Sequence, residues 1–235
     1  MLLNTGTAPV ASANKLITTI AWNINGKTHY ALEGSVFVAG AVVQWLRDAL
    51  GVIHTTAESE TLAASVPDSG GVCFVPAFVG LGAPYWDPQA RGAILGMTRD
   101  TTAAHIARAA LEAVAHQVAD VLQAMTADSG IPITQLQTDG GAAANNLLLQ
   151  MQADFLQIPV GRPKSVESTA RGAACLAGLA VGFWPSLEAL SDHCQIDRLF
   201  YPQMKPDRVA QKRAQWKQAV LRSKNWNNQQ ENTTP

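Results

Sequence analysis

The sequence is poor in cysteine and has no long apolar run. Its three cysteines, Cys73, Cys175 and Cys194, are widely spaced and odd in number, so they form neither a disulfide framework nor a CxxC metal site. We expect buried free thiols of the kind kept reduced in the cytoplasm. The longest apolar run, residues 173–184, contains two glycines and is too short to cross a bilayer. The first residues lack the basic region and long apolar core of a signal peptide. A cytoplasmic protein is therefore predicted.

Charge is also scarce and nearly balanced. Charged residues make up 15% of the chain, and the formal net charge is -1. This excludes the strong basic surface typical of proteins that bind nucleic acids or acidic membranes. Apolar residues make up 47% of the 235 residues, enough to form a real core in one large domain or two small ones.

Turn signals and apolar spacing predict the secondary structure. Asn25 and Gly26 between two strand-like runs predict a β-hairpin. A long helix is expected from about Thr102 to a glycine stop at Gly130. The other expected helices cover residues 34–53, a short stretch within 55–71, and 143–156, 168–184 and 205–226. The other expected strands cover residues 71–78, 93–97, 133–138 and 158–163. This alternation fits an α/β domain with a mixed sheet flanked by helices, followed by a disordered polar tail over residues 227–235.

The first candidate binding motif reads TDGGAAANN and spans residues 138–146. Consecutive glycines let the backbone approach a ligand closely and direct N–H groups at an anion. A helix that begins directly downstream adds partial positive charge. Asn145, in the first turn of that helix, can both donate to and accept from a sugar or a base. Gly141 and Asn145 are therefore candidate nucleotide contacts, and a plain strand-to-helix turn is the alternative. The motif is neither a Walker A loop nor a Rossmann fingerprint.

The second candidate is the pair Gly40 and Gln44, four residues apart on the helix expected over 34–53. Residues at this spacing lie on one helix face, one turn apart. A glycine in the middle of a helix costs about 1 kcal/mol relative to alanine, so it needs a reason. Either another helix packs closely against it, or a ligand's phosphates approach it beside Gln44.

A polar and aromatic cluster occupies the loop expected over residues 79–92. Its members are Tyr85, Trp86, Asp87 and Arg91. Such clusters line clefts, but a structured loop that packs on its own side chains has the same composition. Both interpretations stay open from the sequence.

Together these stretches resemble the FGGY family of carbohydrate kinases. Residues 92–112 are similar to that family's C-terminal signature position for position. Residues 30–48, 75–99, 139–146 and 176–184 look more like the branch of the family that phosphorylates glycerol than like its sugar kinases. Several long motifs in the right order make this resemblance specific.

The resemblance implies an actin-like, ribonuclease-H-like fold of two domains with the active site between them. Residues 1–226 look like the second domain alone, which contributes most of the ATP site. The resemblance implies that Gly40 and Gln44 border the nucleotide's phosphates and that Gly141 and Asn145 hold its adenosine end. It also implies ATP and Mg²⁺ as cofactors, glycerol bound mainly by the other domain, and a homo-oligomeric parent enzyme.

The same resemblance places the catalytic aspartate before the start of this chain. We therefore expect the parent to transfer the γ-phosphoryl group of ATP to glycerol, and this chain alone to be inactive. No catalytic residue and no metal ligand is assigned here; Asp139 either contacts the metal through water or forms a turn. Arg171 departs from the family, whose members usually carry leucine there. The alternatives are another FGGY sugar kinase, an actin-like or chaperone-type ATPase module, and a non-catalytic interaction domain.

Overall fold

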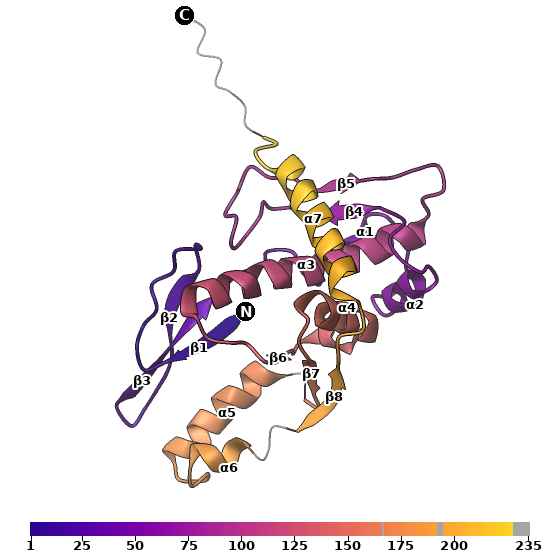
Figure 1. Cartoon of the computed structure of the whole chain (residues 1–235). Coiled ribbons are helices and arrows are strands. Elements are labelled where there is room, and N and C mark those ends of the chain that lie inside the picture. The colour runs from indigo at the N-terminus through magenta and orange to yellow at the C-terminus, as the bar shows by residue number, and fades with distance from the viewer. Residues whose placement is uncertain (166, 192–194, 228–235) are drawn as a thin grey trace, which may run out of the picture.

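The computed structural model describes residues 1–165, 167–191 and 195–227. Its longest helix, α3 (Ala103–Ser129), runs through the middle of the molecule (Figure 1). The predicted ends of this helix are confirmed. At its start, the backbone N–H of Thr102 donates to Nδ1 of His105 at 3.2 Å. At its end, Gly130 adopts the left-handed conformation, with φ at 65°.

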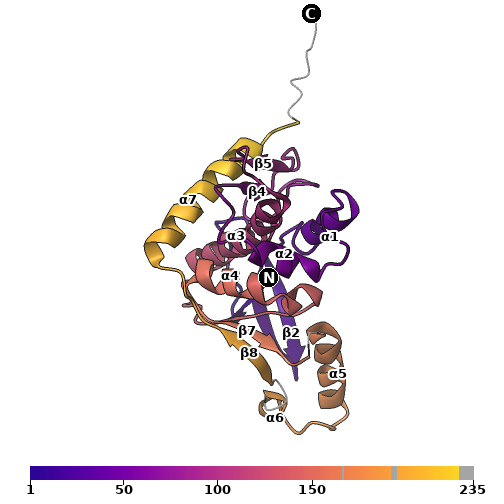
Figure 2. The ribbon, with the colours of Figure 1, turned by 90° about the vertical axis from the view of Figure 1, so that its right-hand side faces the viewer.

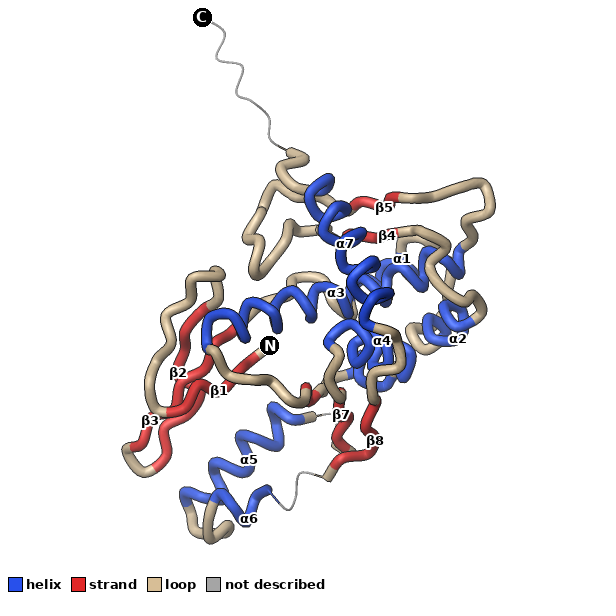
Figure 3. The backbone as a smooth tube through the Cα atoms, viewed as in Figure 1, coloured by secondary structure: helices blue, strands red, loops and turns tan. Residues whose placement is uncertain are grey.

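The strands form three separate sheets, visible as three red groups in Figure 3. The first is antiparallel, in the order β1-β3-β2, and the second is the antiparallel pair β4-β5. In the third, of order β6-β7-β8, β6 pairs with β7 in parallel and β7 with β8 antiparallel, so this sheet is mixed. The strands are β1 (Leu2–Gly6), β2 (Ile17–Ile24), β3 (Lys27–Glu33), β4 (Cys73–Val75), β5 (Ala93–Leu95), β6 (Leu136–Gln137), β7 (Val160–Pro163) and β8 (Ile196–Phe200).

The predicted hairpin is confirmed by β2 and β3. Asn25 and Gly26 both have positive φ, at 52° and 78°, as a tight turn of the primed type requires. β8 and the short helix α6 were not expected from the sequence. The remaining helices are α1 (Ala41–Asp48), α2 (Glu58–Ala64), η1, a 3₁₀ helix (Gly141–Ala144), α4 (Asn146–Leu156), α5 (Ser168–Ala180), α6 (Leu187–Ser191) and α7 (Pro206–Ser223).

The C-terminal helix α7 packs against α3 through a buried polar cluster. In Figure 2, α7 and α1 lie on opposite sides of α3. Asp120 of α3 accepts hydrogen bonds from the Tyr85 hydroxyl and the Trp216 indole, both at 2.7 Å, and forms an ion pair with Arg213. Trp216 is fully buried. Because the carboxylate is surrounded by donors, its burial is compensated.

The loop over residues 79–92 packs on the protein itself. Besides the Tyr85 contact, the Trp86 indole donates to the carbonyl of Lys15 at 2.6 Å. Asp87 accepts from the backbone N–H groups of Gln89, Ala90 and Asn225 at 2.8 to 3.0 Å. The second of the two interpretations of this loop is therefore the one the structure supports.

The helix predicted over residues 34–53 is shorter than expected. It begins at Ala41, so Gly40 is its N-cap and not a mid-helix residue. The preceding carbonyls have partners elsewhere: that of Ser35 accepts from the N–H of Ala83 at 2.9 Å, and that of Val38 accepts from the amide of Gln117 at 3.1 Å. These long-range hydrogen bonds hold the segment in a non-helical conformation.

One further expectation needs correction, that of buried thiols. Helix α5, which carries Cys175, has no buried residue in the described part of the chain. Cys73 and Cys175 are free but only half-buried. Burial, with the negative charge of Glu112 nearby, raises the pKa of the Cys73 thiol to about 12. Cys194 and residues 228–235 of the polar tail lie outside the described residues.

Within the described ranges, none of the helices combines the length and apolar character that a membrane crossing requires.

Candidate functional site

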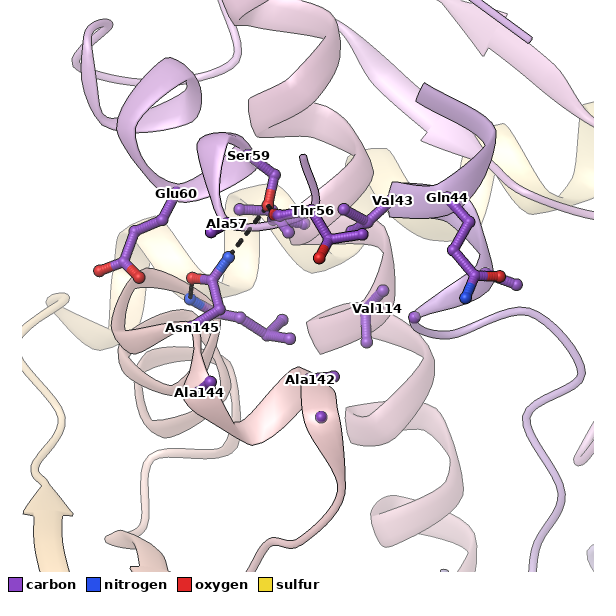
Figure 4. A pocket seen from close by; sticks show the side chains of 15 residues that line it. Val43, Gln44, Thr56, Ala57, Ser59, Glu60, Val114, Ala142, Ala144 and Asn145 are labelled. Carbon is purple, nitrogen blue, oxygen red and sulfur yellow. Dashed lines mark hydrogen bonds between the residues drawn. The ribbon is translucent and has the colours of Figure 1, made fainter. Parts of the chain in front are cut away.

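One cavity of about 480 Å³ brings together segments that lie about a hundred residues apart in the chain. All four residues singled out from the sequence line it: Gly40, Gln44, Gly141 and Asn145. Figure 4 shows Gln44 and Asn145 on opposite sides of the opening. The other lining residues are Ala41, Val43, Thr56, Ala57, Ser59, Glu60, Leu111, Val114, Ala142, Ala144 and Leu148.

Helix α1 forms one wall of the cavity with its N-terminal turn. Gly40 is the N-cap, and the N–H of Gln44 donates to the carbonyl of Gly40 at 3.3 Å, so the two residues lie one turn apart as predicted. No side chain caps this helix end. The partial positive charge of an uncapped helix N-terminus favours an anion in the cavity.

The glycine motif and the start of α4 form the opposite wall. Gly140 has φ of 79° and ψ of 173°, a conformation that is essentially restricted to glycine. The chain then forms the short helix η1, and Asn145 follows as the N-cap of α4. Asn145 was expected in the first turn of the helix; it stands one position earlier. Its Oδ1 accepts from the N–H of Leu148 at 2.9 Å, and this cap fixes the direction of the amide.

Helix α2 forms a third wall that the sequence reasoning missed. The Nδ2 of Asn145 donates to Oγ of Ser59 at 3.3 Å, the contact drawn in Figure 4. Glu60 accepts from the backbone N–H and from Nδ2 of Asn146, both at 3.1 Å. Ser59 is buried although it sits in a polar, acidic stretch. Nothing in the local pattern around residue 59 could have shown that this stretch faces residues 145 and 146.

The floor of the cavity is apolar. Leu111 and Val114 of α3 and Leu148 of α4 supply it. An apolar floor, a polar rim and two converging helix N-termini suit a ligand with a flat apolar body and an anionic end. Glu60 is the sole charged side chain among the described lining residues.

Asp139 and Arg171 lie elsewhere. They line a separate cavity of about 340 Å³ between the third sheet and α5, together with Thr138 and Ser168. The Arg171 guanidinium thus borders this second cavity, where it need not be buried. No group of three or more side chains suited to hold a metal ion occurs among the residues that the structure describes.

The fold, with its mixed sheet and flanking helices, is that of an actin-like ATPase domain, as its structural neighbours show. The model of the C-terminal domain of the FGGY family of carbohydrate kinases matches residues 1–181. The chain belongs to this family, as predicted from its motifs.

Named relatives agree with this membership. The chain is 58% identical over 226 residues to glycerol kinase of Trichlorobacter lovleyi. The matched residues make up 96% of this chain and 46% of the relative. It is 57% identical over 231 residues to glycerol kinase of Herminiimonas arsenicoxydans. The chain thus spans about half the length of the curated relatives it matches.

Solved structures give the same result. The crystal structure of Plasmodium falciparum glycerol kinase with ADP is similar, with a TM-score of 0.87 and 38% identity, covering 94% of this chain and 44% of that one. A gluconate kinase from Lactobacillus acidophilus is similar with a TM-score of 0.77 at 24% identity, which shows the shared fold alone.

Proposed function

We propose that this chain is the nucleotide-binding half of an ATP-dependent kinase that phosphorylates glycerol to glycerol 3-phosphate. The observation that carries the proposal is the convergence of Gly40, Gln44, Gly141 and Asn145 on one cavity. Relatives that are more than half identical to the chain are named glycerol kinase, and one similar structure was determined with ADP. We take residues 1–226 as one domain.

In this proposal the phosphates of ATP lie at the N-terminus of α1, beside Gly40 and Gln44. The adenosine lies over the apolar floor, against Gly141 and Asn145. Mg²⁺ enters with the nucleotide, held mainly by its phosphates. The oxygen-rich phosphates are the ligands that this cation prefers.

Phosphoryl transfer depends mainly on positioning and charge stabilisation, and on a base that accepts the proton of the attacking hydroxyl. Glu60, the one carboxylate among the described lining residues, is held against the start of α4, because each of its oxygens accepts a hydrogen bond from Asn146. We propose that the base and most of the glycerol site belong to the other domain of a cytoplasmic, homo-oligomeric enzyme. Closure of the two domains would exclude water from the transfer.

The proposal is tested by calorimetric titration of ATP with Mg²⁺ into the purified chain and its Asn145→Asp variant. Aspartate keeps the oxygen that caps α4 but replaces the Nδ2 donor with a negative charge. We expect the wild type to bind, and the variant to bind about tenfold more weakly, as the loss of one hydrogen bond to a ligand implies.

The matched control is Asn23→Asp, the same change on the outer hairpin, where Asn23 donates to Thr28. Its affinity for ATP should equal that of the wild type. Absence of ATP binding to the wild type would overturn the proposed function, whereas equal binding by the Asn145 variant would remove that residue from the site.

A further inference from the structure

Arg162 of β7 stands behind the cavity wall without lining the cavity. Its Nη1 lies 3.3 Å from the carbonyl oxygen of Ala143, 3.4 Å from that of Ala144 and 3.1 Å from Oδ1 of Asn146. These three acceptors are the end of η1 and the first residue of α4. The guanidinium thus contacts the segment that joins Gly141 to Asn145 without lining the cavity itself.

This segment has little rigidity of its own. Helix η1 is a single 3₁₀ turn preceded by Gly140, and such short turns have poor internal hydrogen-bond geometry. The last carbonyls of a helix lack partners within it. A guanidinium presents several donors in a fixed plane, and hydrogen bonds from a charged donor are stronger than neutral ones. Arg162 therefore supplies the partners that the turn lacks.

The other edge of the guanidinium is fixed as well. Asp197 of β8 accepts from Nε of Arg162 at 2.8 Å and pairs with Nη2 at 2.7 Å. The Arg162 side chain is only 17% exposed. Because the Asp197 carboxylate holds Nε and Nη2 of the planar guanidinium, Nη1 is directed at the turn before any ligand binds.

A second contact holds the same segment from the far side. The Asn146 amide donates through Nδ2 to Glu60 of α2, while its oxygen faces Arg162. An amide placed between a guanidinium and a carboxylate has one favourable orientation. A continuous series of contacts thus runs from β8 through β7 and the start of α4 to α2, joining two walls of the cavity.

We propose that Arg162 is a positioning residue for nucleotide binding: it holds the turn over residues 141–146 so that Gly141 and Asn145 face the ligand. The inference rests on the proposed function of the cavity. Arg162 acts through Asn145 and the backbone of the turn, and it makes no contact with the nucleotide.

The test is calorimetric titration of ATP with Mg²⁺ into Arg162→Ala. We expect an affinity about five- to tenfold lower, since an unfixed turn must be ordered by the ligand itself. The matched control is Arg208→Ala. This change removes an arginine of α7 that forms an ion pair with Asp68. That variant should bind ATP as the wild type does.

Two readouts separate positioning from a general loss of stability. First, hydrogen exchange of the amides of residues 141–148 should quicken in ligand-free Arg162→Ala, while those of α3 keep their protection. Second, the double variant Arg162→Ala with Asn145→Asp should lose less affinity than the product of the two single losses, since Arg162 acts in part through the position of Asn145. Losses that multiply would contradict the proposal.

If Arg162→Ala fails to fold, Arg162→Lys carries the test, because lysine keeps the charge but cannot bridge Asp197 and the turn together. We expect wild-type thermal stability with about threefold weaker ATP binding, in line with the loss of one or two hydrogen bonds. If Asn145→Asp weakens ATP binding but the folded Arg162 variant binds ATP as tightly as the wild type, the inference about Arg162 is wrong and the proposed function stands. If the wild type itself binds no ATP, the proposed function is wrong, and the inference that rests on it is wrong as well.

Discussion

At the scale of single residues, Gly82 differs from the two glycines that line the cavity. A Cβ on Gly82 would lie 2.2 Å from the carbonyl oxygen of Ser35, so the fold itself requires that glycine. A Cβ on Gly40 would lie 3.8 Å from Cβ of Ala142, an ordinary contact, and a Cβ on Gly141 would meet no atom within 4 Å. The two glycines that line the cavity are therefore free to change as far as the protein's own packing is concerned.

This difference makes Gly141→Ala a sensitive probe of the ligand. Its φ is not in the positive range, so alanine fits the backbone and can raise the free energy of unfolding by up to about 1 kcal/mol. The added methyl group would enter the cavity and weaken ATP binding by about 1–3 kcal/mol, as overpacking does. Calorimetry and thermal denaturation of the same sample measure both effects.

Gly172→Ala on α5 is the matched control, because its Cβ also meets nothing within 4 Å. It should leave ATP affinity unchanged. If Gly141→Ala bound ATP as tightly as the wild type, Gly141 would not contact the nucleotide.

At the scale of elements, three helices meet at one buried imidazole. The ring of His116 of α3 stacks on Phe155 of α4, with centroids 4.1 Å apart, and on Trp216 of α7, with centroids 5.2 Å apart. Burial, followed by the positive charges of Arg213 and Lys212, holds the pKa of His116 well below its ordinary value. These two cations are themselves paired with Asp120 and Glu112 of α3. The lowered pKa favours the neutral imidazole in the folded protein, where the ring stacks between α4 and α7.

Stability should therefore fall as the pH falls below about 6.5. Above that value neither the folded nor the unfolded state protonates this group. Below it the unfolded chain takes up a proton that the folded chain excludes, which lowers the free energy of unfolding by at most about 1.4 kcal/mol per pH unit. Urea denaturation between pH 8 and pH 5 measures the slope.

His116→Phe keeps the aromatic stack and should flatten this slope. His54→Gln, at an exposed position, should retain it. The carboxylates whose pKa is lowered by hydrogen bonds, such as Asp87 and Asp128, affect stability only at lower pH. Burial lowers the pKa of the N-terminal amine of Met1, which contributes a slope of the same sign equally in the wild type and the variants. An equal slope in wild type and His116→Phe would contradict the assignment.

At the scale of the whole molecule, we propose that the cavity is one side of a larger site. The chain covers 46% of the length of a relative named glycerol kinase. Among the described residues that line the cavity, Glu60 is the one carboxylate, and each of its oxygens accepts one hydrogen bond from Asn146. In the proposed function this cavity holds the nucleotide, and the base that accepts the proton of the substrate hydroxyl lies in the other domain.

We therefore expect the 235-residue chain alone to show no glycerol-dependent release of ADP from ATP, even where calorimetry detects ATP binding. A coupled assay with and without glycerol measures this, with a full-length relative as positive control. Glycerol-dependent turnover by the purified chain would show that a base lies within it.

The sequence by itself determined the features that depend on neighbouring residues. The hairpin follows from Asn25 and Gly26, and the ends of α3 follow from Thr102 and Gly130, because turn and cap chemistry is local. The family follows from long motifs in order, which the match over residues 1–181 confirms. The four candidate contacts were also found from the sequence, and their role in nucleotide binding remains a prediction.

Only the tertiary structure decided which segments face each other. It placed α2 opposite the start of α4, so that Ser59 and Glu60 meet Asn145 and Asn146 across 86 positions of sequence. Hydrogen bonds from distant segments to residues 35 and 38 set the start of α1 at residue 41. The tertiary structure also placed Arg162 behind the cavity wall. Local patterns encode helix periodicity and turns, whereas these contacts join distant segments and exist only once the chain has folded.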